Sequence, residues 1–569
     1  MGQTHSSRAD GAHAQDAEAE TFMELYFNKT IEAKTNIGAG IGLFAQEDFE
    51  PGDVIIQLQN PFLCILQQSA FADHCFYCFQ PVSRPSKCTG CNVAGYCGKS
   101  CQVASWQTDH KHECKLFRAC MEQHGEVVPT PTRALMLILL KIKNESKDEL
   151  VWSEKLTSHC SAFMQDRENM ESFRLQARMA VHLAKVPAAL LDMSIEIFCQ
   201  LKINAFRLNT ADDTPIGLCF DPLLARMNHS CWPNAFLSFD GRATTVRALH
   251  PIKASREILV SYIDPTVPRT NRESRLQSRY KFTCSCPKCI KDMSVYDIFL
   301  ESSEDLIRAN EDALAQSTTQ LVDSAKESAS CWENLKDVNY NTLVGYSDLK
   351  LRRLGIANQL RGLKQTLYGH SMANYPYPDI MHTLYDDYLE QKEYAAATVI
   401  RATLVYAVEP FQFPEPWHPV RVTSLFALAK LLHLTYEEPA YALGLLASVS
   451  PNFLECYRPL PTILSLLLLV NENVGKSHGL DTHFATEVRD KLSETERAVR
   501  LLAHNGGDST GIAILDRGFA PGTPGRKTAK DLWKLLALLA NPRRVLMLAD
   551  ECVGPASGNK DSWELIPPS

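Results

Sequence analysis

The sequence lacks an apolar run long enough to cross a membrane. Its two most apolar stretches, Ala134–Leu140 and Ile463–Val470, are far shorter than the roughly 20 residues that a transmembrane helix needs. The polar N-terminus, MGQTHSSRADGAHAQ, holds no apolar segment, so no secretory signal peptide is predicted. Arg8 is the only Lys or Arg among the first 28 residues. The opening residues MGQTHS fit the pattern for N-myristoylation at Gly2. Because one acyl chain without a basic patch binds membranes only marginally, no stable membrane anchor is expected.

Positive charge is also scarce. The chain has 58 Lys and Arg against 66 Asp and Glu, a formal net charge of −8. Sequence-independent binding of nucleic acid requires a basic surface, so direct binding to nucleic acid is not expected. Hydrophobic residues make up 45% of the 569 residues, which is typical of a globular protein that buries a sizeable core. A chain of this length can hold three or more domains.

Cysteine, in contrast, is abundant, with 19 in the chain. Clustered CxxC spacing without a secretion signal indicates metal binding before disulfides, in the cytoplasm or the nucleus. One polar segment holds eight such residues, which match two tetrahedral Zn²⁺ ions with four ligands each. Metal binding would supply the folding energy of this segment, and buried structural cysteines would not account for four pairs. The eight residues are Cys75, Cys78, Cys88, Cys91, Cys97, Cys101, His110 and Cys114.

Four further motifs accompany this cluster. The segment Asn228–Asn234 reads NHSCWPN and predicts an irregular loop whose polar groups need partners. Tyr262 follows in the string SYIDP, and the string CSCPKC follows further on. Upstream, Gly38–Ala45 reads GAGIGLFA; together with the turn at Glu50–Asp53 it predicts a strand, a turn and a second strand.

These motifs, in this order, resemble a SET domain, and the cluster from Cys75 to Cys114 is similar to a MYND finger. The chain therefore resembles the SET and MYND domain-containing protein lysine methyltransferases over roughly residues 30–290. The resemblance implies an α+β fold, in which a β-rich SET domain is split by the zinc finger and a helical insert. A cysteine-rich post-SET segment and an all-α, tetratricopeptide-like C-terminal domain would follow. The expected segments are a disordered leader (1–20), the N-terminal part of SET (21–74), the MYND finger (75–114), the helical insert (115–200), core SET (201–268), the post-SET zinc segment (269–290) and the helical C-terminal domain (291–569).

The resemblance also implies how the zinc ligands group. In MYND fingers the ligand pairs interleave between two ions. The CSCPKC string supplies three ligands, one short of a tetrahedral site, and Cys231 of the NHSCWPN loop would complete a third site; the alternative is that Cys231 is a free core thiol. Val103, Ala104 and Trp106 are expected to brace the finger's short helix against the SET core. The three expected ligand sets are Cys75, Cys78, Cys97 and Cys101; Cys88, Cys91, His110 and Cys114; and Cys231, Cys284, Cys286 and Cys289.

S-adenosylmethionine is the cofactor that the resemblance implies. In-line methyl transfer to a lysine amine needs sulfur, methyl and nitrogen held collinear in a dry, apolar tunnel. Tyr262 and Tyr280 stand where the family has catalytic tyrosines, and Tyr262 is the first candidate for the essential hydroxyl, although either ring alone could serve packing. The expected cofactor-binding residues are Ala39, Gly40, Ile41, Asn204, Asn228, His229, Tyr262 and Phe282.

The C-terminal half is predicted to be helical. Apolar residues recur at helical spacing in Tyr394–Val408 and His418–Leu434, with a proline-rich turn between them. These helices suggest a tetratricopeptide-like array, with a generic helical bundle as the alternative. The Gly- and Pro-rich stretch Gly506–Arg526 predicts a long loop.

Two functions are consistent with these features. The first is a monomeric protein-lysine N-methyltransferase that acts on a lysine of a protein substrate, histone or non-histone. The second is a weakly active or inactive adaptor that binds partner proteins. The resemblance further implies a proline-rich peptide as a partner of the finger. The family often has Lys and Asn at the positions of Ala39 and Ile41, and their absence favours the adaptor; the intact NHSCWPN loop, Tyr262 and Tyr280 favour the enzyme.

Overall fold

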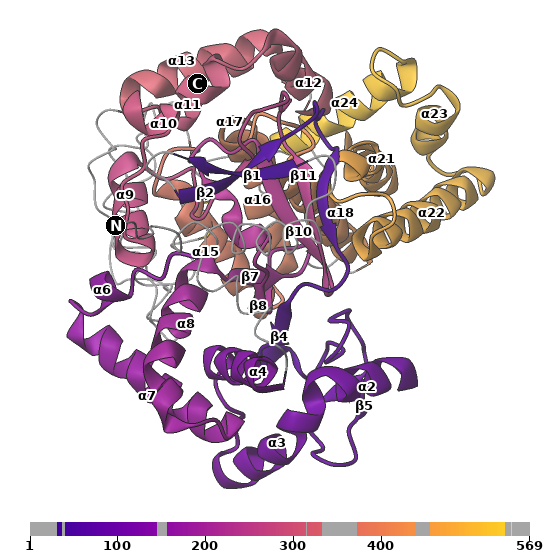
Figure 1. Ribbon diagram of the computed structural model, residues 1–569. Coiled ribbons are helices and arrows are strands. Elements are labelled where there is room, and N and C mark those ends of the chain that lie inside the picture. Colours follow the sequence, from indigo (N-terminus) through magenta and orange to yellow (C-terminus); the bar gives the residue numbers. More distant parts are fainter. Residues whose placement is uncertain are drawn as a thin grey trace, which may run out of the picture. The chain divides into compact units, whose positions relative to one another are not determined.

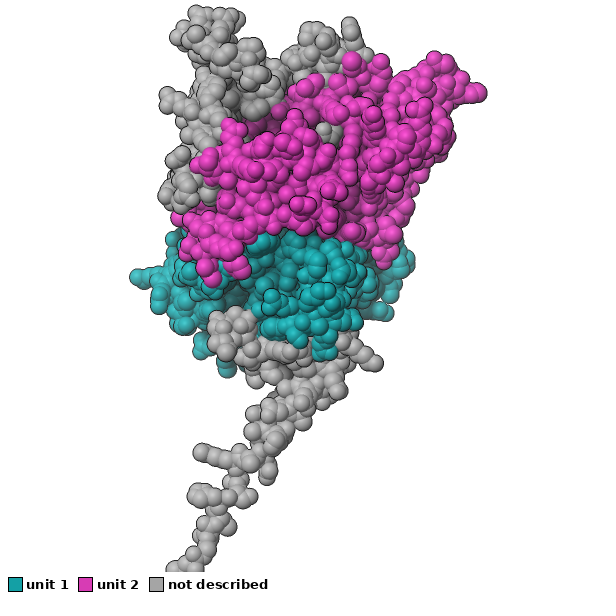
Figure 2. Space-filling view, turned by 90° about the horizontal axis from the view of Figure 1, so that it is seen from above, with its two compact units in different colours: residues 1–264, 273–286 teal, residues 265–272, 287–569 magenta. Residues whose placement is uncertain are grey.

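The chain divides into two compact units, residues 1–264 with 273–286 and residues 265–272 with 287–569 (Figure 2). Each unit is described by itself. The expected leader, Gly2 and Ala39 lie outside the described residues. The computed structural model describes residues 31–36, 40–144, 156–314, 316–332, 372–437, 456–540, 545 and 548.

The first unit is rich in β-structure, as predicted, and its strands form small sheets of two or three strands. Two strands flank the turn at Glu50–Asp53, as the sequence predicted. Pairing is antiparallel except in the last sheet, which is parallel. The sheets are β1 (Ile31–Asn36) with β2 (Gly40–Ala45); β10 (Ala235–Asp240) with β11 (Ala243–Ala248) and β3 (Val54–Leu58); β4 (Leu63–Leu66) with β8 (Pro215–Phe220) and β7 (Phe206–Asn209); β5 (Ser86–Lys87) with β6 (Gly95–Tyr96); and β12 (Leu259–Val260) with β9 (Asn228–His229).

Helices occupy the finger and the predicted insert. A break at Pro187 separates two insert helices, because proline cannot continue the helical hydrogen bonds. The second of these helices continues to Asn204, four residues beyond the expected end of the insert. The helices are α2 (Lys99–Ser105), the π-helix Trp106–His110, α3 (Lys111–His124), α4 (Thr130–Asn144), α6 (Cys160–Phe163), α7 (Arg167–Ala184), α8 (Leu191–Asn204) and α9 (Arg269–Tyr280), which is shared with the second unit.

Strand β4 is buried along its whole length because both of its faces are covered. Successive side chains of a strand point to opposite faces. Leu63 and Ile65 therefore join the core formed with α4, α7 and α8, while Cys64 and Leu66 join the core of the finger. Figure 1 shows β4 beside α4. This arrangement explains the apolar run Ala134–Leu140, whose residues belong to the buried part of α4.

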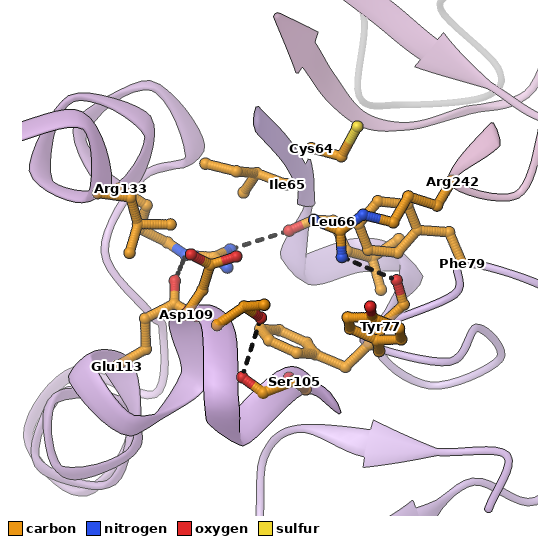
Figure 3. Close-up of a pocket in the computed structure, with 13 residues that line it drawn as sticks. Cys64, Ile65, Leu66, Tyr77, Phe79, Ser105, Asp109, Glu113, Arg133 and Arg242 are labelled. Atoms are coloured by element: carbon orange, nitrogen blue, oxygen red, sulfur yellow. Dashed lines mark hydrogen bonds and ion pairs between the residues drawn. The ribbon is translucent and has the colours of Figure 1, made fainter. Parts of the chain in front are cut away.

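A buried ion pair links the finger to the core of the first unit (Figure 3). Nε of Arg133, on α4, lies 2.8 Å from Oε1 of Glu113, on α3, and both side chains are at most 2% exposed. Arg133 also donates to the carbonyl oxygen of Leu66 over 2.9 Å. Its guanidinium lies 4.9 Å from the ring centroid of Phe117. One arginine thus ties the finger helix, α4 and the end of β4 together.

The second unit is helical in its described residues, as predicted. Both predicted segments, Tyr394–Val408 and His418–Leu434, fall in helices. The predicted loop Gly506–Arg526 is wrong in part, because its centre forms a short helix in which Gly511 packs against Val499. The helices are α10 (Pro287–Ile290), α11 (Val295–Leu300), α12 (Glu304–Leu314), α13 (Thr318–Trp332), α15 (Tyr377–Glu390), α16 (Tyr394–Thr403), the π-helix Leu404–Val408, α17 (Glu409–Gln412), α18 (Pro419–Glu437), α21 (Pro459–Ser477), α22 (His483–His504), α23 (Thr510–Asp516) and α24 (Pro524–Ala537).

The apolar run Ile463–Val470 lies inside α21 and is mostly buried in the second unit. Within the described part of the chain, no helix combines the length and apolarity that a membrane crossing needs.

Charged side chains are buried at the centre of the second unit. Glu409 and Arg421 are each 2% exposed. Arg421 donates to Oδ1 of Asn310 over 2.5 Å, and Arg401 donates to Oγ of Ser424 over 2.9 Å. Among the described residues, Oε1 of Glu409 has no hydrogen-bond partner. Burial raises the pKa of Glu409 to about 7, although Arg401, Ser424 and Arg421 oppose this shift.

We expect Arg133→Met to lower the free energy of unfolding by about 3–5 kcal/mol, because it leaves the Glu113 carboxylate buried and unpaired. The double variant Arg133→Met/Glu113→Leu should recover most of this loss, since both charges are then gone. Urea unfolding of the zinc-loaded, full-length chain measures both. A single variant as stable as the wild type would contradict the structural role of the pair.

We also expect the stability of the second unit to depend on pH through Glu409. Its raised pKa means that the neutral form is favoured in the folded chain. The corresponding stability is complete below pH 4.5, the unfolded value, and is lost as pH rises through about 7. Between pH 5 and pH 8, the free energy of unfolding should therefore fall by about 3 kcal/mol less in Glu409→Gln than in the wild type. Urea unfolding at four pH values tests this; Glu496→Gln on α22 is the control, and parallel curves for wild type and Glu409→Gln would refute it.

Candidate functional site

The NHSCWPN loop is held against the strand that precedes Tyr262. Asn228 and His229, in β9, pair in parallel with Leu259 and Val260 of β12. The side-chain amide of Asn234 forms two hydrogen bonds to the backbone next to β12. Its Nδ2 donates to the carbonyl oxygen of Glu257 over 2.8 Å, and its Oδ1 accepts from the backbone amide of Leu259 over 2.8 Å. Segments about 30 residues apart in the sequence are thus fixed side by side.

His229 lies between Tyr262 and Cys231. The backbone amide of Tyr262 donates to Nδ1 of His229 over 3.0 Å, so Nδ1 carries no proton. In the neutral ring the proton is then on Nε2, which lies 3.2 Å from Sγ of Cys231. The imidazole therefore connects a candidate metal ligand to the residue proposed for catalysis.

Aromatic rings gather around Tyr262. The ring centroid of Tyr262 lies 5.2 Å from that of His229 and 4.9 Å from that of Tyr280. The Phe282 ring lies 5.9 Å from His229. The Tyr262 hydroxyl donates to the carbonyl oxygen of Met227 over 2.5 Å, and the Tyr280 hydroxyl donates to the carbonyl oxygen of Tyr262 over 3.2 Å. Four residues that the sequence singled out are thus brought into one cluster.

Both tyrosines keep their protons at neutral pH. Burial raises the pKa of Tyr262, and the nearby Tyr280 and Glu257 raise it further. Burial also raises the pKa of Tyr280, against the opposing charge of Arg279. The hydroxyls can therefore orient a substrate by hydrogen bonds, but they are unsuited to act as bases.

Glu257 and Gly42 complete the loop, and the sequence motifs did not single them out for this role. Nδ2 of Asn228 donates to Oε1 of Glu257 over 2.8 Å. A Cβ atom on Gly42 would lie 2.2 Å from that same oxygen and 2.9 Å from Nδ2 of Asn228. Glycine at 42 is therefore needed for the Asn228–Glu257 pair to pack against β2. Only the glycine carried a signal in the sequence, as part of GAGIGLFA.

The other predicted cofactor residues lie on different elements. Gly40 begins β2 with φ +80°, and Ile41 follows it in the strand, half-buried. Asn204 ends α8, where its Nδ2 donates to the carbonyl oxygens of Gln200 and Thr157 over 2.8 Å and 3.2 Å. Asn204 thus lies two residues before β7 begins at Phe206.

Among the residues that the structure describes, three groups of side chains could each hold a metal ion, which is the predicted number. Within each group the four donor atoms lie within 4.8 Å of one another. The membership of the groups is the same as in the expected ligand sets. The groups are Cys75, Cys78, Cys97 and Cys101; Cys88, Cys91, His110 and Cys114; and Cys231, Cys284, Cys286 and Cys289.

The donor spacing fits tetrahedral zinc. Two thiolates bound to one Zn²⁺ at about 2.3 Å lie about 3.8 Å apart. The Sγ atoms of Cys78 and Cys97 are 3.8 Å apart, and those of Cys88 and Cys114 are also 3.8 Å apart. His110 presents Nε2, 3.7 Å from Sγ of Cys91. Burial lowers the pKa of His110 to about 4, so its ring is neutral and able to bind a metal at neutral pH.

Hydrogen bonds reach the candidate thiolates from outside the ligand sets. Besides His229 at Cys231, the buried guanidinium of Arg272 donates to Sγ of Cys289 over 3.5 Å. The prediction that Val103, Ala104 and Trp106 brace the finger against the core is wrong for Val103 and Trp106, which are 43% and 50% exposed. The Trp106 ring contacts His110 of the finger, with 6.0 Å between ring centroids. The finger is instead joined to the core by Arg133 and Glu113.

Comparison with known proteins agrees with these motifs. Residues 40–263 match the family model of the SET domain. "SET domain and MYND-type zinc finger protein 6" of Schizosaccharomyces pombe is 32% identical over 44% of this chain and 50% of that protein. Residues 40–263 thus match a SET domain, and the chain is similar to a SET and MYND protein over less than half of its length. The NHSCWPN loop, Tyr262 and the cysteine cluster from Cys75 to Cys114 lie within the matched residues.

Other relatives carry names of lysine methyltransferases. "Histone-lysine N-methyltransferase ASHR1" of Arabidopsis thaliana is 32% identical over 46% of this chain and 55% of that protein. "N-lysine methyltransferase SMYD2" of Homo sapiens is 29% identical over 46% of this chain and 60% of that protein. The match thus spans between half and three fifths of these relatives' lengths.

Solved SET domain structures match weakly. "Crystal structure of the SET domain of LSMT bound to Lysine and AdoHcy" matches with a TM-score of 0.29 and 12% identity, covering 62% of this chain and 81% of that chain. "Structure of Rubisco LSMT bound to AdoMet" matches with a TM-score of 0.28 and 11% identity, covering 76% of this chain and 92% of that chain.

We expect the purified chain to hold three zinc ions and Cys231→Ser to hold two, because the third ion loses one of its four ligands. Inductively coupled plasma mass spectrometry, with protein quantified by amino-acid analysis, measures the ratio. Cys120→Ser is the matched control, since Cys120 lies on α3 outside the three groups and should leave three ions. Retention of three ions by Cys231→Ser would show that Cys231 is not a ligand.

Proposed function

We propose that this chain is an S-adenosylmethionine-dependent protein-lysine N-methyltransferase that transfers the methyl group in line to a lysine amine. One observation carries the proposal. The NHSCWPN loop, Tyr262, Tyr280 and Phe282 come from separate parts of the sequence and form one hydrogen-bonded aromatic cluster. Relatives that match the chain in the SET region carry methyltransferase names, which supports the same reading.

Each residue of the cluster has a proposed role. Asn228, with its amide held by Glu257, and His229 bind the adenosyl part of the cofactor, together with the backbone at Ala39, Gly40 and Ile41. Phe282 and Asn204 complete the cofactor pocket.

The tyrosines act on the substrate lysine. The rings of Tyr262 and Tyr280 wall the apolar stem of the lysine and exclude water from the amine. The carbonyl oxygens of Met227 and Tyr262, already fixed by the two hydroxyls, lie in the same cluster and can accept hydrogen bonds from the amine. Since both hydroxyls stay protonated, we propose that the amine loses its proton to solvent before the rings enclose it.

The zinc ions serve structure in this proposal. The third ion, bound by Cys231 and the three post-SET cysteines, fixes the NHSCWPN loop to the post-SET segment. Zinc sites with four protein ligands are closed, so no chemistry is assigned to these metals.

We also propose the domain organisation that the resemblance implies, from the leader at residues 1–20 to the helical C-terminal domain at residues 291–569. In that last domain, the helices form a tetratricopeptide-like array. The finger takes a proline-rich peptide, and the chain acts as a monomer in the cytoplasm or the nucleus, without direct binding to nucleic acid and without a stable membrane anchor.

We expect Asn228→Ala to weaken S-adenosylmethionine binding by at least tenfold, because it removes the amide that Glu257 orients. Tyr262→Phe should keep the affinity within about threefold, since the ring remains, and should lower the methylation rate by about 100-fold, the usual cost of losing one positioned hydroxyl. Calorimetric titration measures the affinity, and mass spectrometry of a lysine peptide library measures the rate.

Asn144→Ala is the control for these variants, since Asn144 is exposed at the end of α4. If the folded, zinc-loaded wild type does not bind S-adenosylmethionine, the enzyme proposal is refuted and the adaptor function becomes the better account.

A further inference from the structure

Three cationic side chains gather beside the proposed catalytic tyrosines in the first unit. Lys281 separates Tyr280 from Phe282, Arg279 precedes Tyr280, and Lys202 lies on α8, two residues before Asn204. Lys202 and Arg279 are exposed, and Lys281 is half-exposed. Together, Lys202, Arg279 and Lys281 form the cationic cluster.

Aromatic rings hold the two lysines near each other. Nζ of Lys281 lies 4.8 Å from the ring centroid of Phe163, and Nζ of Lys202 lies 5.7 Å from that of Phe173. The two rings touch each other, with 5.3 Å between their centroids. Cations over aromatic faces are stabilised without losing their charge. The pair of rings is thus a platform that carries an ammonium group at each end.

The backbone turns sharply within this cluster. Lys281 has φ +61°, in the left-handed region that costs energy for a residue other than glycine. The turn lets Tyr280 and Phe282 face Tyr262 and His229, while the Lys281 side chain reaches Phe163 on α6. Arg279 and Lys281 are therefore sequence neighbours of the two aromatic residues proposed to bind lysine and cofactor, Tyr280 and Phe282.

The chain itself offsets the cationic charges only in part. None of the three side chains forms an ion pair in the part of the chain that the structure describes. Asp166 accepts two hydrogen bonds from Asn169 and interacts with the Lys281 charge, which helps to lower the pKa of Asp166; Glu196 accepts one hydrogen bond from Ser158. Partial desolvation of the Lys202 ammonium lowers the pKa of Lys202, and the positive charge of Arg279 lowers it further.

We infer that the cationic cluster is a subsite for acidic residues that flank the target lysine of the protein substrate. Flanking residues lie about 3.3–3.6 Å further along an extended chain for each position. Acidic side chains one to four positions from the lysine are therefore the ones that can reach Lys202 and Lys281. This inference rests on the proposed lysine methyltransferase function and adds the class of substrate to it.

A protein segment fits this cluster better than nucleic acid does. The whole chain carries a net charge of −8, so its long-range field repels a polyanion. A short acidic peptide that contains a lysine carries fewer charges and can place its own lysine among the tyrosines. Three cations on one edge suffice for two or three carboxylates.

The test compares two labelled nonapeptides by fluorescence anisotropy with the full-length, zinc-loaded chain. Each has one central lysine; four neighbouring positions are Glu in one peptide and Gln in the other. We expect the Glu peptide to bind about tenfold more tightly at low ionic strength, and the difference to shrink as salt is added. Lys202→Gln/Lys281→Gln should abolish the difference. These two residues are chosen because Arg279 stacks on the Tyr280 ring at 5.2 Å and its replacement would disturb the tyrosine.

Two further variants make the test specific. Arg500→Gln/Lys527→Gln removes two exposed charges from α22 and α24 and should retain the tenfold difference. Lys202→Glu/Lys281→Glu should reverse the preference, so that a peptide with four flanking Arg residues binds more tightly than the Glu peptide. A reversed peptide preference requires direct contact between opposite charges and would not result from unfolding of the variant. Circular dichroism checks that each variant is folded.

Several outcomes would overturn the inference. The first is equal binding of the Glu and Gln peptides to the wild type. The second is a loss of the Glu-peptide preference in Arg500→Gln/Lys527→Gln as large as in Lys202→Gln/Lys281→Gln. The third is tighter binding of a labelled oligodeoxynucleotide than of the Glu peptide, if Lys202→Gln/Lys281→Gln abolishes it.

Mass spectrometry of the same mixtures with S-adenosylmethionine separates this inference from the proposed function. Charge-dependent binding without methylation would refute the enzyme and keep the subsite. Equal binding and equal methylation of both peptides would keep the enzyme and refute the subsite.

Discussion

The parallel pairing of β9 with β12 is the constraint on which the candidate site depends. It joins the NHSCWPN loop to the strand before Tyr262, and Asn234 locks it by bonding the backbone of residues 257–259 from both sides of its amide. A strand pair of two residues would be weak alone, because two ladder positions cannot offset the entropy of closing a long loop. The side-chain hydrogen bonds of Asn234, Asn228 and Tyr262 add stability to this short strand pair. Each of them also positions a group of the candidate site.

A second constraint acts from the other side of the first unit. β4 is covered on both faces, so the insert helices and the finger depend on the same short strand. Arg133 crosses this junction with its charge buried, which is costly unless every donor is matched. It is matched by Glu113 and by the Leu66 carbonyl, with aromatic rings around it (Figure 3). The finger is thereby fixed in orientation as well as attached, since an ion pair of this kind tolerates only one geometry.

Much of this arrangement could be predicted from the sequence, because its signals were local. Ligand spacing in the cysteine cluster and the order of the motifs led to the three metal groups, and helical periodicity found Tyr394–Val408 and His418–Leu434. What could not be predicted depends on long-range contacts. Nothing near Glu257 marks it as the partner of Asn228, which lies 29 positions away. Trp106 looked like a core residue by type, yet the core position was taken by an arginine that sequence reasoning treats as a surface residue.

The protonation states decide what kind of chemistry such a site can perform. Burial keeps Tyr262 and Tyr280 neutral, and His229 is occupied on both ring nitrogens by the Tyr262 amide and Cys231. No group in this cluster is therefore both free and poised to take a proton near pH 7. A reaction that needed a strong base here would be slow, whereas a displacement whose nucleophile arrives unprotonated needs only alignment and dryness. The hydrogen bonds of both tyrosines end on backbone carbonyls, so alignment is set by the fold itself, and small shifts of β9 against β12 would be felt directly at the reacting atoms.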